Sequence, residues 1–145
     1  MKLVVDASIA MKWLVPESLH EEAMALLEVG SAFLAPDLIV AEVGNALWKK
    51  VQRGEITAAT AERAVLAVCS GFPVLHRSTA FAPRALQIAL QLRHPIYDCL
   101  YLACAEVAEA TLVTEDRRFH AAAVHSGLGI EVKRLSEISG SGFLQ

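Results

Sequence analysis

Three aspartates in the sequence lie where a metal ion or a substrate could be bound. Asp6 directly follows the apolar run 3–5, which predicts a strand buried on both faces. Asp98 lies in the first turn of a predicted helix, and Asp116 lies between a predicted strand and the next helix. Because ligands of an open parallel sheet bind outside the carboxyl ends of its strands, we expect these carboxylates to face one crevice.

Each aspartate also has an ordinary structural explanation. Asp6 is suited to start a turn or to cap a short helix. Asp98 is suited to interact with the helix dipole, which is worth about 0.3 to 1 kcal/mol, and Asp116 to cap the next helix, which is worth about 1 kcal/mol. The selective placement favours a site, since the chain has only four aspartates.

Glu42 separates the functional interpretation from the structural one. It is the only charged residue in the run 38–48 of a predicted helix, where no capping role exists and an unpaired buried carboxylate is costly. A solvated helix edge and an approach to Lys49 remain as structural alternatives. Asn45 lies one turn along the same face, where it could orient Glu42 or a bound water.

Carboxylates that converge in one crevice raise one another's pKa unless a cation lies between them. All-oxygen ligands favour Mg²⁺ or Mn²⁺, and no His or Cys lies at metal-ligand spacing near these acids. Ser8 and Thr114 each lie two residues from an aspartate, where they either support the site or cap a turn. Such a cluster on an α/β scaffold indicates phosphoryl chemistry, in which the ion activates water and stabilises charge on the phosphate.

Strand and helix patterns alternate along the chain and must position these acids. The predicted strands are 3–5, 32–35, 73–76, 111–114 and 130–132. The predicted helices are 9–14, 19–29, 38–53, 57–70, 78–93, 95–109 and 117–126, with Ser18, Asp37 and Asp116 among the caps. This alternation indicates an α/β fold, with a central parallel sheet of four to five strands and helices on both faces. We expect one domain over 1–138 and a flexible tail over 139–145.

The composition fits one domain that has a surface for a partner or a second copy. Of 145 residues, 54% are hydrophobic and 20% are charged, a balance that indicates apolar surface beyond what one domain buries. Asp6 and Lys12 interrupt the apolar N-terminal stretch, so a signal peptide is not expected. No uncharged run reaches the ~18 residues of a membrane span, and we expect a cytoplasmic protein without a membrane segment.

Charge and cysteine content narrow the chemistry further. A formal net charge of −3 argues against binding nucleic acid by bulk attraction, so acids would have to be offset locally. The three cysteines are predicted to be buried free thiols in a reducing compartment, not zinc ligands: Cys69, Cys99 and Cys104. The turn 6–10 has no glycine, which excludes a dinucleotide fingerprint and a phosphate-binding loop. The sequence also argues against two other α/β families. A haloacid-dehalogenase-like phosphatase needs Asp-x-Asp after the first strand, where this chain has Asp-x-Ser, and a receiver domain needs a phosphoacceptor aspartate after the third strand, which 76–78 do not supply.

Four segments together resemble PIN-domain proteins of the VapC toxin type. They are LVVDAS at 3–8, EVGNAL at 42–47, YDCLYLA at 97–103 and LVTEDRRF at 112–119. The resemblance covers nearly the whole chain, and Asp6, Glu42, Asp98 and Asp116 match the family's four acids position by position. Some members carry a further acid shortly after the fourth, where this chain has Arg117 and Arg118, and this difference counts against a second tightly held ion.

The resemblance implies a three-layer PIN-like fold, a Mg²⁺- or Mn²⁺-dependent endoribonuclease, a homodimer, and a small antitoxin that blocks the acidic site. Asp6, Asp98 and Asp116 would then hold the metal directly or through waters. Glu42 would either ligate the ion or orient the attacking water, and RNA would be cut by in-line hydrolysis that leaves a 5′-phosphate.

Basic and aromatic residues near the motifs have two interpretations each. Lys12, Lys49, Arg117 and Arg118 could contact the RNA backbone or form a solvated face. Trp13 and Trp48 could stack on a base or receive the antitoxin, although aromatic residues in apolar helices more often belong to the core. Two rival functions remain: a catalytically weak PIN-fold module that binds RNA or protein, and a metal-dependent DNase.

Overall fold

The first strand of the chain, β1 (Lys2–Val5), is the central strand of a five-stranded sheet. The structure is a computed structural model that describes residues 1–139. The strand order is β3-β2-β1-β4-β5, and every neighbouring pair is parallel. The other strands are β2 (Ala32–Pro36), β3 (Val74–His76), β4 (Thr111–Val113) and β5 (Val132–Lys133). In register, Leu3 pairs with Phe33 on one side and with Thr111 on the other.

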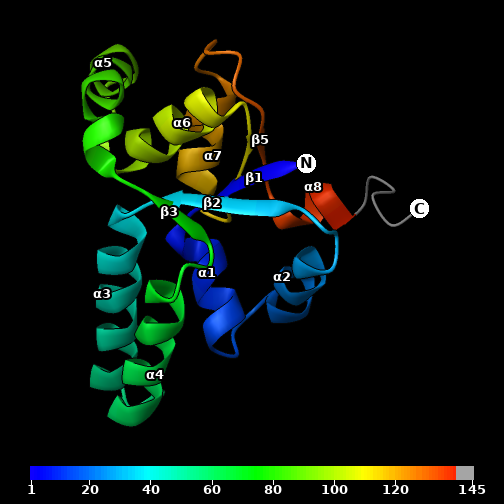
Figure 1. The fold of residues 1–145 in the computed structure, drawn as a ribbon, viewed down its shortest axis with the longest axis vertical. Helices are drawn as coiled ribbons and strands as arrows, with labels where there is room; N and C mark the ends of the chain where they lie inside the picture. The colour runs from blue at the N-terminus through cyan, green and yellow to red at the C-terminus, as the bar shows by residue number, and fades with distance from the viewer. Residues whose placement is uncertain (140–145) are drawn as a thin grey trace.

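Helices cover both faces of this sheet, so the predicted three-layer α/β fold is confirmed (Figure 1). In that view α1 (Ala7–Leu14), α2 (His20–Leu27), α3 (Leu38–Gln52) and α4 (Ala58–Cys69) lie below the sheet, while α5 (Ala82–Leu92) and α6 (Ile96–Ala108) lie above it. The remaining helical segments are η1 (Ser78–Ala80), α7 (Arg117–Val124) and α8 (Leu135–Ser139).

The core is built around β1 and α6. Leu3, Val4 and Val5 are fully buried because both faces of the sheet are covered. In α6, the run 99–105 is buried without interruption, since the helix contacts β1, β2 and β4 as well as α5. A helix buried on all sides has little freedom to shift, and it therefore fixes the side chains of its first turns at the carboxyl edge of the sheet.

Several predicted boundaries were wrong, and each error has a local cause. Leu19, with a positive φ of 63°, precedes α2, and Ser18 does not cap this helix. Asp37 precedes α3 but does not cap it, because its carboxylate accepts hydrogen bonds from Ser78. The predicted helix 78–93 divides into η1 and α5, with a proline in the first turn of α5. The short α8 was not predicted.

Three further expectations concern the cysteines, the tail and the membrane. Cys99 and Cys104 are buried free thiols as predicted, whereas Cys69 is exposed because it lies on the outer face of α4 at its last turn. Of the predicted flexible tail 139–145, Ser139 ends α8 and 140–145 lie outside the described residues. Within residues 1–139, the structure contains no helix with the length and apolar character needed to cross a bilayer.

Candidate active site

Asp6 is the most enclosed acid at the carboxyl edge of the sheet, with 7% of its surface exposed. It caps α1 by accepting a hydrogen bond from the Ile9 amide at 3.3 Å. Its two carboxylate oxygens also accept hydrogen bonds from Ser8 Oγ at 2.5 Å and from Thr114 Oγ1. Burial, with a smaller contribution from the charge of Asp98, raises the pKa of Asp6 to about 6 in spite of these hydrogen bonds. Asp6 is therefore both the N-cap of α1 and an acid of the candidate site.

The two hydroxyls connect Asp6 to the segment that carries Asp116. Ser8 Oγ accepts a hydrogen bond from the Glu115 amide at 2.9 Å, and Thr114 Oγ1 accepts one from the Asp116 amide at 3.1 Å. Each hydroxyl thus donates to Asp6 and accepts from the loop that joins β4 to α7. This arrangement orients the Asp6 carboxylate and fixes the loop backbone against it.

Glu42 lies on α3 and faces α6. The hydroxyl of Tyr101 donates a hydrogen bond to Glu42 Oε1 at 2.6 Å. Partial burial raises the pKa of Glu42, the Tyr101 hydrogen bond lowers it, and the charge of Asp98 raises it. Burial also raises the pKa of Tyr101, with further increases from Glu42, Asp6 and Asp98, so the phenol stays a hydrogen-bond donor. A paired but incompletely solvated carboxylate matches the predicted role better than a solvated helix edge.

Asp98 lies in the first turn of α6, where His94 holds it. His94 Nε2 lies 2.6 Å from Asp98 Oδ2, and the imidazole itself packs against Phe119 with ring centroids 5.9 Å apart. Sequence reasoning did not identify His94 or Tyr101 as parts of the site. For Tyr101 the spacing contained a signal, since it follows Asp98 by three residues and so lies near the same face of α6. His94 lies in the loop before α6, where helical spacing gives no such signal.

Asp116 is the outermost of the four predicted acids. It is exposed, and its carboxylate caps α7 by accepting from the Phe119 amide at 2.9 Å. It lines a cleft of about 450 Å³ together with Ser8 and basic residues of α1 and α3. The charge of Asp98 thus acts on both Asp6 and Glu42, and all three acids act on Tyr101, whereas Asp116 lines the adjoining cleft.

The oxygen donors of these acids fit the chemistry of a hard divalent cation. Among residues 1–139, no group of three or more His, Cys, Asp or Glu side chains is already arranged to hold a metal ion. Within the same residues, no lysine or arginine forms a salt bridge with Asp6, Glu42 or Asp98. Oxygen-donor acids of this kind, in which the charge of Asp98 raises the pKa of both Asp6 and Glu42, are the environment that Mg²⁺ or Mn²⁺ stabilises.

The supporting and basic residues divide into two groups. Ser8 and Thr114 contact Asp6, as described above, whereas the Asn45 side chain is exposed and makes no hydrogen bond to the described residues. Lys12 is buried and pairs with Glu17 at 3.1 Å. Lys49 is exposed and lines the cleft beside Asp116, and both Arg117 and Arg118 are exposed at the start of α7.

The aromatic residues near the motifs differ in their exposure to solvent. Trp13 belongs to the core, because its indole N–H donates to the Ala23 carbonyl at 2.7 Å and its ring packs edge-on against Phe33. Trp48 and Tyr97 are exposed, with 58% and 61% of their surfaces accessible. Trp48 is therefore the tryptophan available to a ligand or partner.

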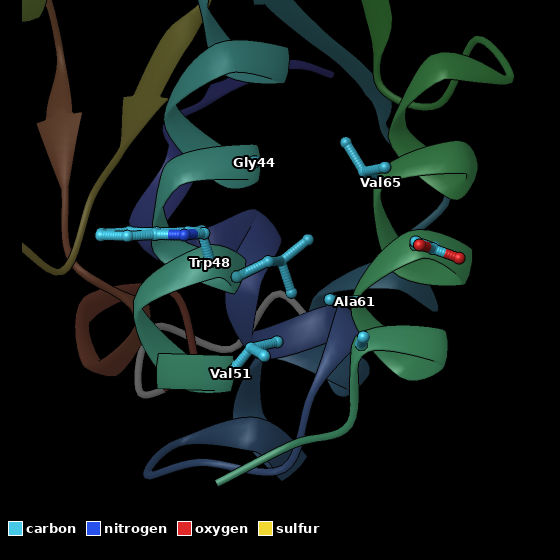
Figure 2. A pocket seen from close by; sticks show the side chains of 8 residues that line it. Gly44, Trp48, Val51, Ala61 and Val65 are labelled. Carbon is cyan, nitrogen blue, oxygen red and sulfur yellow. The ribbon is translucent and has the colours of Figure 1, made fainter. Parts of the chain in front are cut away.

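An apolar groove lies between α3 and α4, on the same helix as Glu42. It has a volume of about 260 Å³, and most of its lining is apolar. Figure 2 shows Ala61 and Val65 of α4 facing Gly44 and Val51 of α3 across it, while the ring of Trp48, which also lines the groove, extends from α3 on the side away from α4. The absence of a side chain at Gly44 keeps this part of the groove open, since a Cβ there would come within 4.0 Å of Val65.

Comparison with known proteins gives one family match and several relatives. The PIN domain model matches residues 3–124. Ribonuclease VapC3 of Pyrobaculum aerophilum is 33% identical over 120 residues, which cover 81% of this chain and 92% of that protein. Ribonuclease VapC1 of Mycobacterium tuberculosis is 34% identical over 133 residues, which cover 90% and 95% of the two chains.

Solved structures show the same fold. The crystal structure of PAE2754 from Pyrobaculum aerophilum superposes with a TM-score of 0.68 at 25% identity, over 95% of this chain and 86% of the other. VapBC2 from Rickettsia felis, bound to a DNA fragment from its promoter, superposes with a TM-score of 0.58 at 16% identity, over 92% and 98% of the two chains. A toxin–antitoxin complex from Klebsiella pneumoniae has a TM-score of 0.62 at 16% identity, over 92% and 97%.

Proposed function

The chain belongs to the PIN-domain family, and from this premise we propose that it is a metal-dependent endoribonuclease, the toxin of a toxin–antitoxin pair. The observation that carries the proposal is the group formed by Asp6, Glu42 and Asp98. These acids come from three elements that are distant in sequence, the charge of Asp98 acts on the other two, and no lysine or arginine of the described residues forms a salt bridge with any of them. The two relatives named ribonucleases align over most of their length, which agrees with this chemistry.

We assign Asp6, Asp98 and Asp116 to metal binding and Glu42 to binding or to orienting the water. Mg²⁺, or Mn²⁺ in its place, would supply a nucleophilic water at neutral pH and would stabilise charge on the phosphate. The chain's own contribution is orientation: Ser8 and Thr114 fix Asp6, and His94 fixes Asp98.

Glu42 is suited to receive a proton from water. Tyr101 occupies Oε1, and Glu42 Oε2 accepts no hydrogen bond from any residue that the structure describes. Partial burial and the charge of Asp98 raise the pKa of Glu42 above its ordinary value, and a raised pKa makes a carboxylate a better general base. In this assignment Tyr101 keeps the carboxylate in place, and Oε2 contacts the water.

An antitoxin is proposed as the partner that blocks these acids. Among the solved structures with this fold, one is a toxin–antitoxin complex, and two others, VapBC2 and FitAB, are each bound to a DNA fragment. In this chain the apolar groove between α3 and α4 begins on the helix that carries Glu42, and Trp48 is exposed beside it. An apolar antitoxin segment bound in the groove would lie along the helix that carries Glu42, and from there it could cover the acids.

We also propose that the protein is a homodimer that acts in the cytoplasm. Leu86 and Leu90 lie one turn apart on α5, the outermost helix above the sheet in Figure 1, and both are exposed. A pair of exposed leucines on one helix face suits contact with a second copy. Light scattering at micromolar concentration should give twice the mass of the 15.6 kDa chain, and a mass of one chain would remove this part of the proposal.

RNA and DNA substrates of identical sequence test the activity. With Mg²⁺, the protein should cut single-stranded RNA to fragments with 5′-phosphates and leave DNA intact, and EDTA should abolish the cut. Cleavage of DNA at an equal rate would favour the DNase alternative. RNA binding without cleavage in Mg²⁺ or Mn²⁺ would favour a binding module.

A further inference from the structure

The cleft beside Asp116 is lined by more positive charge than any other part of the site. It lies between α1 and α3 and has a volume of about 450 Å³. Ser8 and Asp116 of the candidate site line this cleft. Four basic residues also line it: Lys12, Lys49, Lys50 and Arg53. A chain with a net charge of −3 thus concentrates cations next to its acids.

Glu17 bridges two of these cations inside the cleft. Its Oε1 lies 3.1 Å from Lys12 Nζ, and its Oε2 lies 3.2 Å from Lys50 Nζ. Lys12 is only 8% exposed and comes from α1, Lys50 comes from α3, and Glu17 belongs to the loop after α1. One carboxylate therefore uses both oxygens to bridge two ammonium groups from different helices.

We propose that Glu17 occupies a binding site for an RNA phosphate, and that the substrate's phosphodiester displaces it from Lys12 and Lys50. A phosphodiester has two charged oxygens and can bridge two ammonium groups as the carboxylate does. The site would hold a phosphate close to the scissile bond, because Ser8 and Asp116 line the same cleft. The identity of the ligand as RNA rests on the proposed function, whereas the exchange of carboxylate for phosphate does not.

The remaining cations fit a path that continues from this site. Lys49 is exposed at the cleft and has no salt bridge among the described residues, and Arg53 has only a 4.0 Å contact with Glu55. Both are free to contact the next phosphates of the strand. The buried Lys12, by contrast, needs a counter-charge at all times, so exchange between Glu17 and a phosphate keeps it neutralised.

The Glu17→Gln variant tests this exchange against a matched control. Glu55→Gln removes one charge that also pairs with Lys50, at 3.3 Å, but Glu55 does not line the cleft. Both changes are made in the Asp6→Asn protein with EDTA, and binding of a labelled 20-nucleotide single-stranded RNA is followed by fluorescence anisotropy. This background measures binding without cleavage.

We expect Glu17→Gln to tighten RNA binding roughly threefold to tenfold, since a competing carboxylate is lost. The plot of log affinity against log salt should steepen by about 0.7 for each phosphate gained. Glu55→Gln should change affinity less than twofold. Equal affinities for the wild-type residue and Glu17→Gln, with both proteins folded, would overturn the proposal, as would an equal gain in Glu55→Gln.

A second pair of variants covers the case in which Glu17→Gln does not fold. Arg53→Gln should weaken RNA binding roughly threefold to tenfold, and Arg63→Gln, an exposed change on α4 outside the cleft, should leave it unchanged. Equal effects of both variants would overturn the phosphate path. These measurements detect RNA binding alone, so they stay valid even if the protein is not a nuclease. If the protein does cleave RNA but neither Glu17→Gln nor Arg53→Gln changes RNA binding, only this inference is removed.

Discussion

The Tyr101 hydroxyl donates a hydrogen bond to Glu42 Oε1 at 2.6 Å and thereby joins α6 to α3 at the site. The two residues are 59 positions apart in sequence, and each comes from a helix that covers a different face of the sheet. Tyr101 is itself buried, so its position is fixed by the core. The orientation of the proposed water-binding carboxylate is therefore set by the packing of α6.

Replacement of Tyr101 by phenylalanine should lower activity and shift its pH dependence. The hydrogen bond from Tyr101 lowers the pKa of Glu42, so its loss raises that pKa. Because the proposed base is the deprotonated Glu42 carboxylate, the acidic limb of the rate profile should move to higher pH, and the rate at pH 7 should fall about tenfold. Tyr97→Phe, at an exposed position, should leave the profile unchanged. A lower rate with an unmoved limb would show that Tyr101 acts only through the fold.

Asp6 should make the metal-free protein less stable as pH rises from about 4 to 6. Its folded-state pKa is raised from 3.8 to about 6, so the native state binds the proton more tightly than the unfolded chain in this window. The free energy of unfolding should fall by up to about 3 kcal/mol across it. Urea unfolding in EDTA should show a flatter dependence in Asp6→Asn.

Asp37 provides the comparison of opposite sign. The hydrogen bonds from Ser78 lower the pKa of Asp37, so its contribution to stability is lost as pH falls. Asp37→Asn should therefore leave the decline between pH 4 and 6 in place. An Asp6→Asn protein whose stability falls as steeply as the wild type would contradict the burial of an uncompensated charge at Asp6.

His94 should support metal binding without contacting the ion. Its Nε2 lies 2.6 Å from Asp98 Oδ2, and a residue that orients a ligand is typically worth about tenfold to 100-fold in metal affinity. His94→Gln should weaken Mn²⁺ binding by about tenfold, measured by calorimetry, with little change in the far-ultraviolet circular dichroism. His125→Gln, an exposed change at the end of α7, is the control. Equal affinities of the two variants would remove His94 from the site.

Trp48 should contribute to antitoxin binding and not to catalysis. It is 58% exposed beside the apolar groove, and exposed aromatic anchors often contribute 2 kcal/mol or more to a complex, about 30-fold in affinity. Trp48→Ala should weaken binding of the cognate antitoxin by about that factor while RNA cleavage persists. Leu66→Ala removes a similarly exposed apolar side chain outside the groove and should have little effect. Antitoxin binding that is unchanged in Trp48→Ala would exclude this groove.

The strands and the four acids were predictable because their signals are local. The run 3–5 is apolar throughout, as a strand covered on both faces must be, and Asp6 follows it directly. Glu42 was conspicuous because it is charged within an apolar helix. The sequence could therefore name these acids as candidates, and their roles in catalysis and in metal binding stay predictions.

What the sequence did not predict depends on contacts between distant segments. The partners of Glu42 and Asp37 are far away in sequence: Tyr101 of α6 reaches Glu42 of α3, and Ser78 returns beside the end of β2. The short α8 lies against α2, and a five-residue helix is too short to be stable by itself. Glu115, next to Asp116, accepts from the Leu135 amide at 2.6 Å and is a structural acid that no local pattern distinguishes from the acids of the site.

Mn²⁺ binding to the wild type and to two aspartate variants tests the central claim most directly. Asp98→Asn removes an acid whose charge acts on both Asp6 and Glu42, whereas Asp37→Asn removes the one aspartate outside the proposed site. Titration calorimetry at pH 7 should show one Mn²⁺ site in the wild type and in Asp37→Asn, and at least tenfold weaker binding in Asp98→Asn, with all three proteins folded. Binding to Asp98→Asn with wild-type affinity would contradict the account.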